Sequence, residues 1–286
     1  MNSQHCPICD CAATVDLSAY HELALDQAPK RYSIMSCSQG CGLRWMTPYP
    51  QPEDYQDLYN DAYYEQPQAN CTSYAEEKNE LAACYATLAR KFCTYKISGT
   101  LLDIGCGTGN FLSIAQAHGI NAEGIEPSEY ASTKAKEKGL KVKCGILNSE
   151  TPAQSYQAAY CSHVLEHVPD AHAFMHDLQN ILTPGAPIYI EVPLQFTGII
   201  DILKRHLKKR ETYSIYSIHH HYFFTPKSIA LLLKKHGFEI ISITTFLPSR
   251  RATRKGFRAR ILQSLLWTAD LLANRGDVIS VWARRV

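Results

Sequence analysis

The sequence predicts a doubly wound α/β domain with a mostly parallel, seven-stranded sheet, preceded by a small cysteine-rich module. Three observations support this fold class. Short apolar segments alternate with amphipathic ones from residue 100 onward, as in βαβ units. A glycine-rich turn directly follows the first apolar segment. Finally, five of the 11 cysteines fall near the amino terminus, at Cys6, Cys9, Cys11, Cys37 and Cys41.

The bulk composition is that of an ordinary globular protein. The chain has 286 residues, 45% of them hydrophobic and 20% charged, so disorder is not expected. The first residues are polar and no apolar run is long enough to cross a bilayer, so we expect neither a secretory signal nor a membrane span. Cysteine-rich chains without a signal are typical of a reducing compartment, which predicts a cytoplasmic location. The net charge of +2 gives no general argument for nucleic-acid binding.

The alternating segments are assigned in chain order from periodicity and turn residues. Strands are expected at 100–104, 121–126, 140–144, 158–163, 187–192, 239–246 and 278–283. Helices are expected at 110–118, 129–138, 171–182 and 226–236, with a further amphipathic helix around 81–92. The predicted domains are a metal-binding module at 1–46, a connector with a cap helix at 47–98, and the α/β domain at 99–286 with insertions at 194–222 and 248–275.

The turn after the first strand has the chemistry of a ligand-binding loop. Gly105, Gly107 and Gly109 alternate between the strand and the next helix, where glycine permits positive φ and a close approach to a ligand. A helix amino terminus favours negative ligand groups. Glu126 ends the next strand, where an acid can bind both hydroxyls of a ribose.

These residues resemble the first motifs of class I SAM-dependent methyltransferases, which bind S-adenosylmethionine (SAM) in a Rossmann-like fold. The similar stretches are Asp103–Gly109, Gly124–Ser128, Ser162–Val168, Leu182–Ala186 with Ile190–Pro193, and Phe223–Pro226 with His236–Phe238. The resemblance implies a reversed final strand and a SAM site made by Asp103, Gly105, Gly107, Gly109 and Glu126. Ile125 and Leu147 are adenine-wall candidates, with ordinary core packing as the alternative. The family usually opens its fourth strand with Asp, whereas this chain has Tyr156-Gln157.

The amino-terminal cysteines form two pairs with the spacing of a metal site. Cys6 and Cys9 make a C-x-x-C knuckle, and Cys37 and Cys41 supply a second pair. Four thiolates suit a closed structural Zn²⁺ site, which would provide the folding energy of so short a segment. The arrangement resembles the zinc-binding part of a group that includes bacterial sugar C-methyltransferases, although that group carries a further carboxy-terminal domain. One extra residue separates Cys37 from Cys41, and Cys11 is a rival ligand.

Histidines are the candidate acid–base residues. Aligned on Phe223-Phe224, His220 corresponds to the catalytic His of the sugar C-methyltransferases, and His219 replaces their Glu. An imidazole is a plausible general base near neutral pH, whereas the alternative is a surface turn without a role. His163 ends the fourth strand, where it could face the acceptor or the cofactor.

The predicted function is methyl transfer from SAM to a small molecule, with a sugar or related glycan or natural-product metabolite implied by the resemblance. Basic runs at 204–210 and 250–260 suit a phosphate-bearing acceptor, an anionic membrane surface or plain solvation. The alternatives are a lipid-linked acceptor at a membrane, a zinc-ribbon module that binds RNA or protein, and SAM binding without catalysis. The sequence does not specify an oligomeric state.

Overall fold

The computed structural model describes residues 5–15, 33–49, 74–196, 220–246, 268 and 276–286. Its main sheet has seven strands in the order β10-β11-β8-β7-β4-β5-β6. These strands are β4 (Leu101–Ile104), β5 (Ala122–Glu126), β6 (Val142–Cys144), β7 (Ala158–Ser162), β8 (Pro187–Pro193), β10 (Phe238–Phe246) and β11 (Val278–Arg285). β11 pairs antiparallel with both of its neighbours, and the other pairings in this sheet are parallel. The predicted fold, including its reversed final strand, is confirmed.

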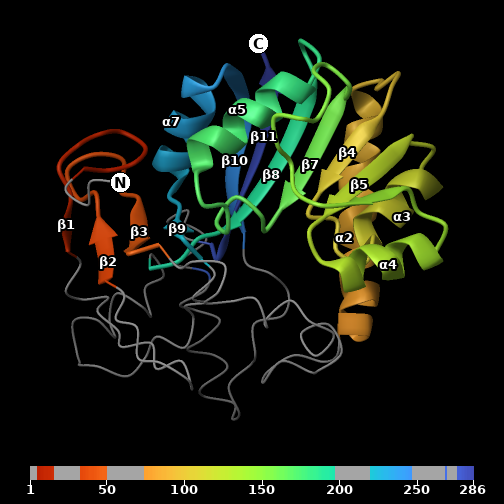
Figure 1. Cartoon of the computed structure of the whole chain (residues 1–286), viewed down its shortest axis with the longest axis horizontal. Coiled ribbons are helices and arrows are strands. Elements are labelled where there is room, and N and C mark those ends of the chain that lie inside the picture. Colours follow the sequence, from red (N-terminus) through yellow and green to blue (C-terminus); the bar gives the residue numbers. More distant parts are fainter. Residues whose placement is uncertain (1–4, 16–32, 50–73, 197–219, 247–267, 269–275) are drawn as a thin grey trace.

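Helices cover both faces of this sheet (Figure 1). They are α2 (Tyr74–Thr94), α3 (Asn110–Ala117), α4 (Glu129–Glu137), α5 (Ala171–Ile181) and α7 (Pro226–Lys235). Successive strand residues point to opposite faces, so Leu101 and Tyr160 pack with α2 and α3 while Leu102 and Cys161 pack with α5 and α7. Every residue of β4 is buried, as expected of a central strand covered on both faces.

Local signals explain where several of the helices begin. Asp170 accepts hydrogen bonds from two backbone amides at the start of α5. Thr225 and Ser228 form a reciprocal capping box at α7, whose first residue is Pro226. Ser128 caps α4 by accepting from Ala131 N. Among the described helices, none is long and apolar enough to cross a membrane.

A second, antiparallel sheet joins the amino-terminal module to the α/β domain. It contains β1 (Thr14–Val15), β2 (Ser33–Ser36), β3 (Arg44–Thr47) and β9 (Tyr222–Phe223), in that order. The sequence placed Tyr222 at the end of an insertion, whereas it pairs with Trp45. The module also shares one hydrophobic cluster with α5 and α7. The amino-terminal sheet therefore takes one of its strands from the carboxy-terminal half of the chain.

Polar contacts fix the module against α5 and α7. Thr225 Oγ1 donates to Cys41 O at 2.7 Å, and Lys227 Nζ donates to Gly40 O at 2.7 Å. Lys235 Nζ donates to Ile8 O at 2.5 Å, and His172 Nε2 lies 2.8 Å from Pro7 O. These four contacts all end on carbonyl oxygens of the cysteine loops, so the loops are held directly by the α/β domain.

Candidate active site

The glycine turn lies at the carboxyl end of β4. Gly105, Gly107 and Gly109 all have positive φ, at 69°, 53° and 79°. Gly105 N donates to Ile125 O at 2.8 Å, which ties the turn to the neighbouring strand β5. A Cβ at position 105 would lie 2.4 Å from Val164 Cγ2, so only glycine fits between the turn and the loop after β7. The glycine turn and the loop after β7 are therefore in direct contact.

Glu126 is held at this turn by backbone amides. The residue is 5% exposed, and its Oε2 accepts from Gly107 N at 2.8 Å while its Oε1 accepts from Ser128 N at 2.9 Å. Burial raises the pKa of Glu126, and the two amide hydrogen bonds oppose that shift. The predicted ribose acid thus lies beside the predicted glycine turn.

Asp103 lies beneath the turn as a buried carboxyl group. It is 2% exposed, and its Oδ2 has no hydrogen-bond partner within the described residues. Burial raises the pKa of Asp103 well above its ordinary value, and the charge of Glu126 adds to the effect. Burying a carboxylate without a partner is costly, so this position favours a ligand that brings a cation or donor.

Ile125 and Leu147 are both buried, at 4% and 8% exposure, in the cluster that includes α5 and α7. This packing is compatible with both predictions made for the two residues, which are a wall of the adenine site and ordinary core packing. Gln157 stands where the family usually has an Asp, and its role is structural. Its Oε1 accepts a hydrogen bond from Thr100 N at 2.7 Å. It precedes β7 at the amino end of that strand, opposite the edge where the glycine turn lies.

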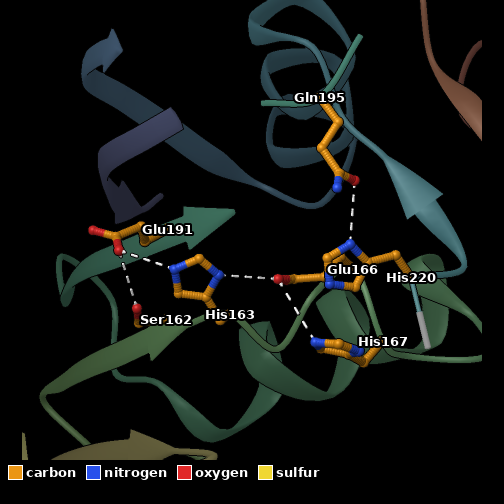
Figure 2. Close-up of polar contacts among 7 residues, drawn as sticks. All are labelled: Ser162, His163, Glu166, His167, Glu191, Gln195 and His220. Atoms are coloured by element: carbon orange, nitrogen blue, oxygen red, sulfur yellow. Dashed lines mark hydrogen bonds and ion pairs between the residues drawn. The ribbon is translucent and has the colours of Figure 1, made fainter. Parts of the chain in front are cut away.

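A group of histidines surrounds Glu166 in the loop after β7, and we call His163, Glu166, His167 and His220 the Glu166 cluster (Figure 2). Glu166 is fully buried. Its Oε1 lies 3.3 Å from His163 Nδ1 and 3.7 Å from His167 Nε2. His167 and His220 face each other edge to face, with ring centroids 4.8 Å apart. Residues separated by more than 50 positions in the chain thus meet around one buried carboxylate.

His163 connects Glu166 to a second carboxylate. Its Nε2 lies 3.4 Å from Glu191 Oε1, which also accepts from Ser162 Oγ at 3.3 Å. Desolvation lowers the pKa of His163, but the hydrogen bonds and charges of Glu166 and Glu191 outweigh it and raise the pKa to about 10. An imidazolium has no lone pair to accept a proton, so His163 is better suited to hold charge than to act as the general base.

The side-chain amide of Gln195 orients His220. Its Nδ1 lies 3.2 Å from Gln195 Oε1, and an amide oxygen can only accept, so Nδ1 carries the proton. This leaves Nε2 as the unprotonated nitrogen. The other predicted histidine of this run, His219, lies outside the described residues.

His221 has a different environment from its neighbour. It is 1% exposed, its Nδ1 lies 3.3 Å from Val168 O, and its ring contacts Tyr49. Burial lowers its pKa to about 4, so it stays neutral and structural. His220 and His221 therefore do not act as one group, although they are consecutive.

Comparison with known proteins decides the family, because the methyltransferase domain family matches residues 74–243, more than half of the chain. The chain belongs to the methyltransferase domain family. The ubiquinone biosynthesis O-methyltransferase of Hydrogenovibrio crunogenus is 34% identical over 99 residues, and that of Photorhabdus laumondii is 31% identical over 97. These matches cover 32% and 31% of this chain, and 41% and 40% of the respective relatives. The chain thus spans about two fifths of the length of these curated relatives.

Solved structures show the same fold. A SAM dependent methyltransferase from Archaeoglobus fulgidus superposes with a TM-score of 0.51 at 17% identity, covering 74% of this chain and 99% of that one. A second from Listeria monocytogenes gives a TM-score of 0.51 at 18% identity, covering 72% and 99%. At these identities the likeness concerns the fold of the methyltransferase domain.

The cysteine cluster precedes the matched methyltransferase domain in the sequence. Cys6 Sγ is 3.5 Å from Cys41 Sγ, and Cys9 Sγ is 3.4 Å from Cys37 Sγ. The four sulfur atoms all lie within 4.8 Å of one another. Zn–S bonds of about 2.3 Å in a tetrahedron separate the sulfurs by about 3.8 Å, so the four thiols fit this ion. The exposed rival Cys11 lies outside this group.

Sequence reasoning missed four residues of the site. Glu166 and His167 belong to the motif 162–168, for which the sequence predicts no chemical role, and no prediction concerns Glu191 or Gln195 individually. The His163-x-x-Glu166-His167 spacing is a signal that could have found the first two. Glu191 and Gln195 carry no such signal, because their roles come from contacts made across the sheet edge.

Proposed function

We propose that this methyltransferase domain transfers a methyl group from SAM to a hydroxyl oxygen of a small molecule. The observation that carries the proposal is the contact between Gly105 and Val164. This contact places the glycine turn, beneath which the carboxyl group of Asp103 is buried, beside the loop that carries most of the Glu166 cluster. The two halves of a methyl-transfer site, cofactor and acceptor, then share one edge of the sheet.

The residues at the turn fit SAM. The methionine part of SAM carries an ammonium group, which matches the buried Asp103 Oδ2 that lacks a partner among the described residues. Asp103, Gly105, Gly107 and Gly109 would hold the methionine part, and Glu126 the ribose hydroxyls. Ile125 and Leu147 would line the adenine. When bound, SAM supplies an electrophilic methyl group on a sulfonium.

The Glu166 cluster would handle the acceptor. Methylation of a hydroxyl releases its proton, so a base is needed near the acceptor oxygen. His220 would act on that proton through Nε2, the nitrogen that Gln195 leaves unprotonated. His163, charged and bridged between Glu166 and Glu191, would stabilise negative charge on the acceptor oxygen.

The acceptor class rests on two sources of unequal weight. The curated relatives are named O-methyltransferases, which favours an oxygen acceptor over a carbon or nitrogen one. The sequence predicts a sugar as the acceptor, which is a more specific proposal than a hydroxyl oxygen. The names of these relatives do not support a sugar.

The test is a methylation assay with the full chain, isotopically labelled SAM and two acceptor panels, one of catechol-type ring hydroxyls and one of nucleotide sugars. We expect methyl transfer to oxygen in one panel, with the demethylated cofactor formed in equal amount. SAM binding without transfer to any hydroxyl, carbon or amine acceptor would contradict catalysis, and methylated carbon would contradict the choice of oxygen.

We further propose that residues 1–46 form a zinc module, with Cys6, Cys9, Cys37 and Cys41 as ligands. Its role would be to hold β3, whose partner strand β9 begins at Tyr222, two residues after His220. Trp45 pairs with Tyr222, and Met46 N donates to His221 O at 3.0 Å. Zinc would then act on catalysis through the placement of His220.

We expect full-length protein purified without added metal to contain about one zinc per chain, as a closed Cys₄ site retains its ion. Cys6→Ser should lower zinc content and turnover together while SAM affinity persists, because the glycine turn is held by β5 and by the loop after β7. Cys93→Ser, at an exposed cysteine of α2, is the matched control. Background zinc in folded, active protein would exclude the site, and loss of zinc from Cys11→Ser but not from Cys41→Ser would change the ligand set.

A further inference from the structure

We infer that Glu166, His167 and His220 form a binding site for a divalent metal ion, separate from the cysteine cluster. Each residue offers one ligand atom, and the three atoms lie within 4.8 Å of one another. Modest movement of side chains around one ion would bring them to bonding distance, because metal–nitrogen and metal–oxygen bonds are about 2.0–2.2 Å long.

The donor set defines the class of ion. Two imidazoles and one carboxylate bind divalent transition-metal cations such as Mn²⁺, Co²⁺ or Zn²⁺, and three protein ligands leave positions open for a substrate. The four thiolates of the cysteine cluster are soft ligands, and they favour Zn²⁺ instead. The chain thus offers two sites of different chemical character.

The buried carboxylate is the strongest single observation. Glu166 is fully buried, and its Oε2 has no hydrogen-bond partner among the described residues. The Oε1 atom already faces His163 and His167. A cation on the Oε2 side would compensate an oxygen whose burial is otherwise costly.

The three ligands are positioned by contacts outside the site, as in known metal centres. Gln195 Oε1 lies 3.2 Å from His220 Nδ1, which places a proton on Nδ1, so Nε2 is the nitrogen that would ligate an ion. His221 N donates to Glu166 O at 2.8 Å, which fastens the segment of His220 to the loop of Glu166. The pairing of β9 with β3 holds that segment from the other side.

The catalytic meaning of the ion rests on the proposed function. A cation lowers the pKa of a hydroxyl bound to it, so His220 would act on the acceptor through the ion rather than as a direct base. The hydroxyl proton passes to solvent water. The acceptor oxygen then forms a bond to the methyl carbon as the carbon–sulfur bond breaks, and the electron pair of that bond stays on sulfur.

The test uses Mn²⁺ alone as the probe, because Mn²⁺ prefers carboxylate and imidazole ligands to thiolates. Titration of the full chain, followed by electron paramagnetic resonance, should show one bound ion. Glu166→Gln and His220→Asn should each weaken Mn²⁺ binding by about 10-fold or more, since even residues outside the first coordination shell contribute about 10–100-fold. His176→Asn is the matched control, because His176 is an exposed histidine on α5 with a carboxylate neighbour.

Each outcome decides one of the two proposals. Wild-type protein that is folded by circular dichroism and binds no Mn²⁺ overturns the metal site, as does wild-type affinity in His220→Asn. If Glu166→Gln does not fold, His220→Asn decides alone, because His220 is only partly buried. SAM calorimetry and turnover with a chelator separate the failures. Activity that survives metal removal leaves His220 as the direct base, whereas absent SAM binding contradicts the proposed function and not the site.

Discussion

Replacement of His220 by alanine is expected to lower turnover by about 10²–10⁴-fold, the usual contribution of a positioned acid–base group. The reason is that His220 is the residue of the Glu166 cluster whose unprotonated nitrogen is fixed, by Gln195. SAM affinity should be unchanged, because Gln195, His167 and Phe223, which His220 contacts, lie outside the glycine turn. Initial rates give the first quantity and calorimetry gives the second.

His176→Ala and His163→Ala serve as the controls for this experiment. His176 is exposed on α5, and its loss should leave the rate unchanged. His163→Ala should lower the rate by removing a charge between Glu166 and Glu191. Normal turnover in His220→Ala together with an inactive His163→Ala would indicate that the general base is His163, at the end of β7, and not His220. Normal turnover in both variants would indicate an acceptor that is already nucleophilic.

The sequence predicts the main sheet because its signals are local. Strands of three to nine residues alternate with helices along most of the domain, and each boundary depends on residues close in the chain. The start of the third strand shows the limit of this approach. The strand expected from Leu140 begins at Val142, because Leu140 N donates to Ala135 O and belongs to the turn that closes α4.

The cofactor half of the site is predictable for a related reason. The carboxyl ends of parallel strands meet at one sheet edge, so residues that end different strands must lie near one another. Glu126 ends β5 and the glycine turn follows β4, and the hydrogen bond from Gly107 N to Glu126 Oε2 is the result.

The acceptor half of the site depends on a long-range contact that no local sequence pattern predicts. His220 reaches Glu166 because β9, only two residues long, pairs with β3 of the amino-terminal module. So short a strand has no detectable alternation, and its partner lies far away in the chain. The resemblance therefore predicts a role for His220, but no local pattern predicts that Glu166, His167 and Gln195 lie around it.

Replacement of Glu126 by alanine is expected to weaken SAM binding by about 1–3 kcal/mol, the cost of leaving buried hydrogen-bonding groups without a partner. The variant removes the acceptor for Gly107 N and Ser128 N as well as the proposed acceptor for the ribose hydroxyls. Calorimetry should therefore show a dissociation constant raised by about 5–150-fold, since about 1.4 kcal/mol corresponds to a factor of ten. Glu126→Gln should fall between alanine and wild type, because its amide keeps one acceptor oxygen in a similar shape.

Glu129→Ala is the matched control for this variant. Glu129 lies three residues further along the chain, in the first turn of α4, and it is exposed. Its removal tests whether a negative charge near this helix is sufficient, and SAM affinity should be unchanged. Unchanged SAM affinity in a folded Glu126→Ala protein would contradict the assignment of the ribose acid. Tight binding of NADH in place of SAM would contradict the cofactor itself, because the turn would then accommodate a pyrophosphate at the amino terminus of α3 instead of a methionine beside Asp103.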